Sequence, residues 1–178
     1  DADKGSALAL EQFRSADNMT EKFGALAVLA QIPGARRDEA LATFEREFAD
    51  DPLVLDKWFS LQAMVSEPGV LTHVRELMNH PSFSMTNPNR LRALVGAFST
   101  NLTQFNAADG SGYRFLAGIV AELDARNPQV AARLLAAFRA WRSMESGRRA
   151  MAETALREVA AQPGLSADVR DIVDRSLA

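Results

Sequence analysis

The chain has 178 residues, of which 47% are hydrophobic and 24% are charged, and its formal net charge is −3. These proportions are typical of a folded globular domain, and the negative charge disfavours nucleic-acid binding, which needs a basic face. The absence of cysteine excludes disulfides and thiolate metal sites. No apolar run approaches the roughly 20 residues that span a bilayer, so we expect no membrane association.

Apolar residues recur at helical spacing along nearly the whole chain. The first clear stripe, Met19, Phe23, Leu26 and Ala30, advances by four, three and four residues, which places these side chains on one helix face. No stretch alternates with period two for long enough to predict a sheet. Further stripes of the same kind lie at 41–48, 55–65, 71–78, 91–98, 116–123, 130–141, 151–159 and 169–173.

Short signals between the stripes predict where helices begin and end. Asp51-Pro52, Asn87-Pro88 and Asn127-Pro128 each combine an N-cap side chain with proline at the first helical position. Pro-Gly pairs at 33–34, 68–69 and 163–164 interrupt the chain between helices. Residues 102–112 have the composition of an extended loop, in which two glycines permit turns, and we interpret 109–112 as a plain loop leading into a helix.

About ten helices joined by short breaks predict an all-α fold. The proline-marked starts at 52, 88 and 128 are 36 and 40 residues apart, near the roughly 34–47-residue periods of helical repeats. We therefore expect a curved superhelix of antiparallel helix pairs, a HEAT/ARM-like α-solenoid forming one domain over residues 1–178. A compact irregular bundle is the alternative.

The residues themselves do not form a catalytic set. His73 and His80 are seven residues apart, but a metal site needs three or four ligands and no H-E-x-x-H motif occurs. The chain also lacks a G-x-S-x-G elbow and a phosphate-binding glycine loop. We interpret one acidic cluster as a solvated face with helix-start charges, and not as a pair of catalytic carboxylates: Glu45, Glu47, Asp50, Asp51 and Asp56.

Arg90 stands in an unusual place for a cation. It follows Asn87, Pro88 and Asn89 in the first turn of a predicted helix, where a positive charge costs a few tenths of a kcal/mol, up to about 1. A partner should therefore offset this cost. One alternative is an ion pair with a carboxylate on a neighbouring helix. The other is a peptide carbonyl or carboxylate, because a helix N-terminus and a guanidinium both favour such a ligand.

A second helix start repeats these features. Asn127, Pro128 and Gln129 are followed one turn later by Arg133, so amide side chains, free first-turn N–H groups and a guanidinium again occur together. The same two alternatives, an ion pair or a peptide ligand, apply to this arginine.

Three segments together resemble one known family. PLVLDKWFSLQA (52–63), SFSMTNPNRLRALVGAF (82–98) and DGSGYRFL with LDARNPQVAARL (109–134) are similar to the C-terminal helical domain of bacterial aminopeptidase N, a zinc-dependent exopeptidase of the gluzincin group. The likeness is collinear over roughly residues 17–138. It implies that residues 1–178 are the last domain of a larger hydrolase, with residues 1–17 leading from the preceding domain. The start at Asp1, without methionine, fits such a piece.

The resemblance also implies a function. The family's C-terminal domain covers the catalytic domain, encloses the active-site cavity, gates access and contacts the leaving-group side of the peptide. The catalytic residues and Zn²⁺ would belong to the catalytic domain of the same polypeptide, and the expected partners are that domain and short peptides in the cytoplasm. This chain would hold no metal and no catalytic residue. The substrate-binding residues implied are Arg90, Gln129, Arg133, Asn89 and Asn87.

A second hypothesis belongs to another class of protein. A free-standing α-helical-repeat scaffold could bind a protein partner on its concave face. Helical periodicity alone does not distinguish the two hypotheses. The paired N-P-N-R and N-P-Q-V-A-A-R segments favour the aminopeptidase, because a generic scaffold does not require them.

Overall fold

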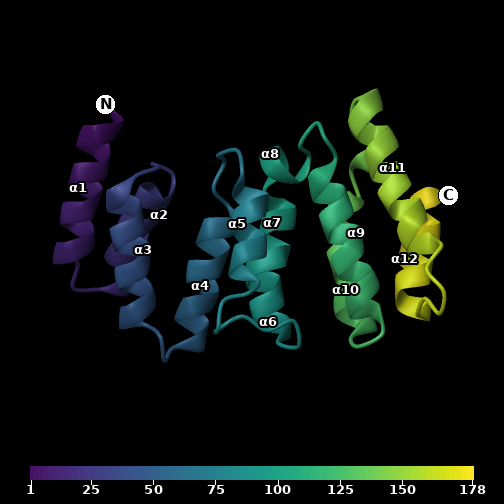
Figure 1. Cartoon of the computed structure of the whole chain (residues 1–178), viewed down its shortest axis with the longest axis horizontal. Helices are drawn as coiled ribbons and strands as arrows, with labels where there is room; N and C mark the ends of the chain where they lie inside the picture. Colours follow the sequence, from purple (N-terminus) through teal and green to yellow (C-terminus); the bar gives the residue numbers. More distant parts are fainter.

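The structure is a computed structural model that describes all 178 residues, and it contains helices and no strands. The helices stand in one row from α1 at the N-terminus to α12 at the C-terminus, as Figure 1 shows. This arrangement confirms the predicted all-α solenoid of antiparallel helices. None of the helices combines the length and the apolar character needed to cross a membrane.

The elements follow one another with short connections. A π-helical segment, η1 (Arg92–Gly96), joins α6 and α7 into one continuous helix, and two 3-10 segments, η2 (Leu135–Phe138) and η3 (Trp141–Ser143), follow α10. The α-helices are α1 (Ala2–Ser15), α2 (Met19–Ala30), α3 (Ala35–Glu47), α4 (Pro52–Ala63), α5 (Val70–Leu77), α6 (Pro88–Leu91), α7 (Ala97–Thr100), α8 (Leu102–Phe105), α9 (Ser111–Asp124), α10 (Pro128–Leu134), α11 (Ser146–Ala160) and α12 (Ala167–Leu177).

The alternation of direction gives the solenoid two different edges. In Figure 1, α2, α4, α6, α10 and α12 begin at the bottom of the row, which we call the lower edge, while α1, α3, α5, α9 and α11 begin at the upper edge. Every helix that begins at the lower edge is capped by a side chain that accepts a hydrogen bond from a first-turn N–H group. The caps are Asn18, Asp51, Asn87, Asn127 and Ser166.

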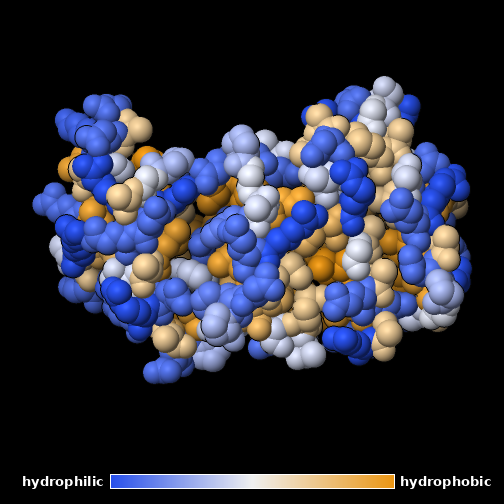
Figure 2. All heavy atoms as spheres, viewed as in Figure 1, coloured by the Kyte–Doolittle hydropathy of each residue, from blue (hydrophilic) through white to orange (hydrophobic).

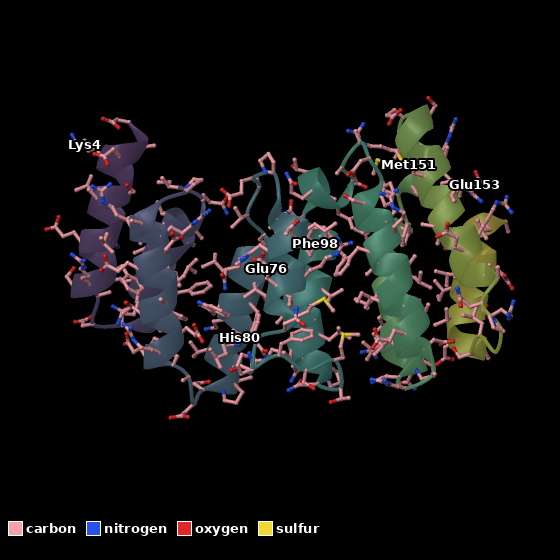
Figure 3. All side chains as sticks on the ribbon, in the orientation of Figure 1. Lys4, Glu76, His80, Phe98, Met151 and Glu153 are labelled. Carbon is pink, nitrogen blue, oxygen red and sulfur yellow. The ribbon has the colours of Figure 1, made fainter.

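One continuous hydrophobic core of 41 buried residues runs through the row. Residues 1–17 belong to it, because Leu10 and Phe13 of α1 are buried in the same cluster. Neighbouring pairs are joined by aromatic contacts: Phe98 of α7 meets Phe115 of α9 edge-on with ring centroids 5.6 Å apart, and Figure 3 shows Phe98 between these helices. Hydrophilic residues dominate the surface in Figure 2, whose upper outline dips between its two ends.

Two local predictions were wrong in detail. The expected extended loop at 102–112 contains a short helix, α8, because the side chain of Asn101 caps it by accepting the N–H of Gln104. The stripe at 130–141 does not form one helix: α10 ends at Leu134 and the chain continues in 3-10 turns. Phe138 and Trp141 are nevertheless buried as the stripe predicted.

Candidate functional site

The lower edge brings together the helix starts that the sequence singled out. The Oδ1 atom of Asn87 accepts hydrogen bonds from the N–H groups of Asn89 (3.0 Å) and Arg90 (3.2 Å). Asn127 caps α10 in the same way through the N–H of Val130, at 3.2 Å. These caps satisfy part of the first-turn donors. As a result α6 and α10 begin in defined positions on the same side of the solenoid (Figure 1).

The guanidinium of Arg90 points into the protein and faces α4. Arg90 is only 4% exposed, and its Nε lies 3.2 Å from Oδ1 of Asp56. Its Cζ lies 4.9 Å from the ring centroid of Phe59, within the range of a cation–π contact. Its Nη2 donates to the carbonyl oxygen of Pro52, at 3.4 Å. The structure therefore contains the ion pair that the sequence offered as one of two alternatives.

Arg90 and Asp56 interact through the attraction of their charges more than through aligned hydrogen bonds. The side chains of Arg90 and Asp56 are 5% and 20% exposed, so water screens their attraction only weakly. Nε and Nη1 of Arg90 and Oδ1 of Asp56 are buried without an aligned hydrogen bond. Removing one charge of such a pair costs about 3–5 kcal/mol, because the other charge stays buried alone.

The burial of Asp56 corrects one interpretation of the acidic cluster. Asp51 does carry the expected helix-start role, accepting the N–H groups of Leu53 and Val54. Asp56, however, belongs to no solvated face, because Arg90 draws it into the contact between α4 and α6. Two other members of the cluster contact neighbouring elements: Oε1 of Glu45 lies 2.9 Å from Nε2 of His80, and Glu47 forms an ion pair with Lys22 at 2.6 Å.

The other predicted substrate residues are exposed. Asn89 lies on the surface of α6, and Gln129 and Arg133 lie on the surface of α10, where neither side chain forms a hydrogen bond or an ion pair. Asn87 is exposed and serves as the cap of α6. No hydrogen bond links the α6 group to the α10 group, so they are two separate sets of donors on two helices that begin at the same edge.

Arg92 was not among the candidate peptide-binding residues predicted from the sequence. This side chain is exposed, and its Nη2 donates to Oδ1 of Asn89 at 2.6 Å. It has no carboxylate partner. Residues two apart on a helix point in nearly opposite directions, so the burial of Arg90 turns Arg92 toward solvent. The two-residue spacing of Arg90 and Arg92 is visible in the sequence. It shows that only one of them can face α4, but not which one.

The two histidines have structural partners. Nε2 of His80 lies 2.9 Å from Glu45, and its Nδ1 accepts the N–H of Ser82; His80 lies toward the lower edge in Figure 3. Nε2 of His73 lies 2.9 Å from Oε1 of Gln62, an amide that is itself buried. No group of three or more His, Cys, Asp or Glu side chains in the chain could hold a metal ion. The residues present therefore do not fit a zinc site.

A family model covers the whole chain. It is described as "Domain of unknown function (DUF3458_C) ARM repeats" and matches residues 1–178. The chain belongs to this family. The ARM-repeat description of the DUF3458_C domain agrees with the solenoid of helix pairs described above.

Relatives of this DUF3458_C domain are named aminopeptidases. The chain is 40% identical over 174 residues to proteins named "Aminopeptidase N" from Haemophilus influenzae and Escherichia coli, covering 97% and 96% of this chain. The crystal structure of Legionella pneumophila aminopeptidase A in complex with aspartic acid matches with a TM-score of 0.93 and 34% identity over 98% of this chain. The chain spans about a fifth of the length of these relatives.

Proposed function

We propose that this DUF3458_C domain is the C-terminal lid of a zinc-dependent aminopeptidase. In this proposal the domain closes over a catalytic domain in the same polypeptide, which supplies Zn²⁺ and all catalytic residues. The lid narrows access to the cavity and contacts the leaving-group side of short peptides. By the family resemblance, the compartment would be the cytoplasm.

One observation carries the proposal. Two helices that begin at the lower edge, α6 and α10 (Figure 1), bring exposed arginines with them: Arg92 directly follows α6 and Arg133 lies in the last turn of α10, and neither forms an ion pair with a carboxylate. Asn89 and Gln129 add amide groups beside them. Such donors suit peptide carbonyls and a terminal carboxylate, because a guanidinium offers paired N–H groups.

Arg90 has a different place in this proposal. Its contact with substrate remains a prediction, and the burial of its guanidinium puts Asn89 and Arg92 nearer to any peptide at the edge. Asn87 contributes through the cap that fixes the first turn of α6. Asn89 and Arg92 would therefore make the direct contacts at α6, with the buried Arg90 behind them and Asn87 fixing the helix start.

The physical role is positioning. A peptide held at its far end by charged donors stays in register with the catalytic centre, and each hydrogen bond to a charged group contributes about 1.5–3 kcal/mol. A small chromogenic amide, such as an aminoacyl p-nitroanilide, is too short to use these contacts. Lid residues should therefore affect long substrates selectively.

The test compares two substrates in the natural polypeptide that contains this chain. Arg133→Ala and Arg92→Ala should each lower kcat/KM for a tetrapeptide by about tenfold, with little change for an aminoacyl p-nitroanilide. Arg149→Ala is the matched control, because this arginine is exposed on α11 near the upper edge and has no ion pair. Equal losses on both substrates, or no loss on either, would contradict the proposal.

A further inference from the structure

We propose that Asp56 and Phe59 of α4 are positioning residues that orient the first turn of α6, so that Arg92 and Asn89 face the lower edge. The inference rests on the proposed function, because it assigns these exposed groups to peptide contact. Neither Asp56 nor Phe59 would touch substrate. They would act through the buried guanidinium of Arg90.

The first step is the direction of Arg90. Asp56 and Phe59 stand three residues apart on α4, which places them on the same helix face. The guanidinium of Arg90 lies between the carboxylate (Nε to Oδ1, 3.2 Å) and the aromatic ring (Cζ to centroid, 4.9 Å). With the carbonyl oxygen of Pro52 as a third contact, α4 holds this side chain through three interactions.

The second step is the rotation of α6 about its axis. A helix turns by about 100° per residue, so Arg90 and Arg92 point about 200° apart. When Arg90 is fixed toward α4, Arg92 must point away from it. The exposed Arg92 is then held by Asn89, whose Oδ1 accepts from Nη2 at 2.6 Å. Asn89 and Arg92 are therefore joined to each other on the exposed side of the helix.

The third step is the contact between α4 and η1, the helical turn that follows α6. The π-helical segment η1 begins at Arg92, and the hydroxyl of Ser60 donates to the carbonyl oxygen of Ala93 at 2.8 Å. In a π-helix some carbonyls lose their usual i+4 partner, so a side chain from a neighbouring helix can supply one. One stripe of α4, from Asp56 to Ser60, thus fixes the helix both before and after Arg92.

The ion pair between Arg90 and Asp56 is not expected to contribute much to the stability of the fold. A buried pair without aligned hydrogen bonds is often no better than apolar side chains of the same volume. Arg90 also lies in the first turn of its helix, where a cation is disfavoured. A requirement for a fixed orientation of α6 accounts for a pair that stability alone does not favour.

The experiment uses the natural polypeptide that contains this chain and four variants. Asp56→Asn removes the charge with little change in volume, and Phe59→Leu removes the ring while keeping apolar bulk. Arg92→Ala and the double variant Asp56→Asn with Arg92→Ala complete a double-mutant cycle. Asp171→Asn is the matched control, because Asp171 pairs with Arg175 on the exposed surface of α12.

We expect Asp56→Asn to lower tetrapeptide kcat/KM by about tenfold, with turnover of the aminoacyl p-nitroanilide unchanged within about twofold. We expect Phe59→Leu to act in the same direction by about threefold, and this milder variant decides the question if Asp56→Asn fails to fold. In the Arg92→Ala background, Asp56→Asn should add no further selective loss, because its effect passes through Arg92.

Two results would overturn the inference in distinguishable ways. If Arg92→Ala is selective for the tetrapeptide but Asp56→Asn lowers both substrates equally, or adds its full effect in the double variant, the α4 pair is only structural and the proposed function stands. If Arg92→Ala leaves both substrates unchanged, peptide contact at this edge fails, and the positioning role fails with it.

Discussion

The side chain of Asn101 terminates α4 although it lies 38 residues beyond the carbonyl of Ala63. Its Nδ2 donates to the carbonyl oxygens of Ala63 (3.1 Å) and Val65 (2.8 Å), and Asn101 is 4% exposed. The same side chain caps α8 through Oδ1. One buried amide thus joins the C-terminal end of α4 to the start of α8.

Asn101→Ala should lower the free energy of unfolding by about 2 kcal/mol, because two buried carbonyls lose their donor. The single core of the chain allows this to be measured by urea denaturation of the 178-residue chain itself. Asn79→Ala is the control, since Asn79 makes a similar hydrogen bond to the carbonyl of Arg75 on the exposed surface. Equal effects of the two substitutions would show that burial of the Asn101 amide is unimportant.

Two glycines of α9 should respond in opposite directions to alanine. A Cβ at Gly112 would lie 2.2 Å from the carbonyl oxygen of Phe105, so Gly112→Ala should destabilise the chain by about 3 kcal/mol. A Cβ at Gly118 meets no atom within 4 Å, so Gly118→Ala should stabilise it by about 0.5–1 kcal/mol through helix propensity. Thermal or urea unfolding measures both, and a neutral Gly112→Ala would contradict the close approach of α8 to α9.

The cap of α11 should make stability depend on pH. Backbone N–H groups of Arg148 and Gly147 donate to the Glu145 carboxylate, each at 2.7 Å, and they lower the pKa of this group below its ordinary value of 4.5. A carboxyl whose pKa is lower in the folded state stabilises the protein above its unfolded pKa. This contribution is lost as the pH falls through the folded pKa.

Glu145→Gln should therefore be less stable than the parent chain at pH 7, and the difference should shrink below pH 4.5 and vanish at lower pH. Urea unfolding at several pH values measures the difference. Glu158→Gln is the control, because no N–H group donates to that exposed carboxylate on the same helix. A difference that grows toward acid would contradict the sign of the pKa change.

Local signals explain why much of the fold could be predicted from sequence. The starts of α4, α6 and α10 lie at the three predicted prolines, because an Asx cap and a fixed proline φ act within a few residues. The single stripe at 130–141 predicted burial and not helix type, since 3-10 turns also bring side chains three apart to one side. Trp141 is fixed there by a distant partner, donating to the carbonyl of Ser176 at 3.2 Å.

The candidate site was predictable only in part for the same reason. The sequence identified Arg90 as a residue that needs a partner, but Asp56 lies 34 residues away and its pairing depends on how α4 packs against α6. Arg92 carried no local anomaly, because its proposed role follows only from the inward direction of Arg90. Tertiary contacts therefore decided which arginine is exposed.

The final prediction concerns the isolated 178-residue chain. It should neither hydrolyse aminoacyl p-nitroanilides nor retain stoichiometric zinc after dialysis, because a zinc site needs three or four ligands and the chain has no cluster of three. His73 and His80 are held by Gln62 and Glu45, and no third ligand accompanies either pair. Metal analysis and an activity assay with added zinc provide the measurement. One bound zinc per chain with metal-dependent hydrolysis would contradict the lid role, because the chemistry would then lie in this domain.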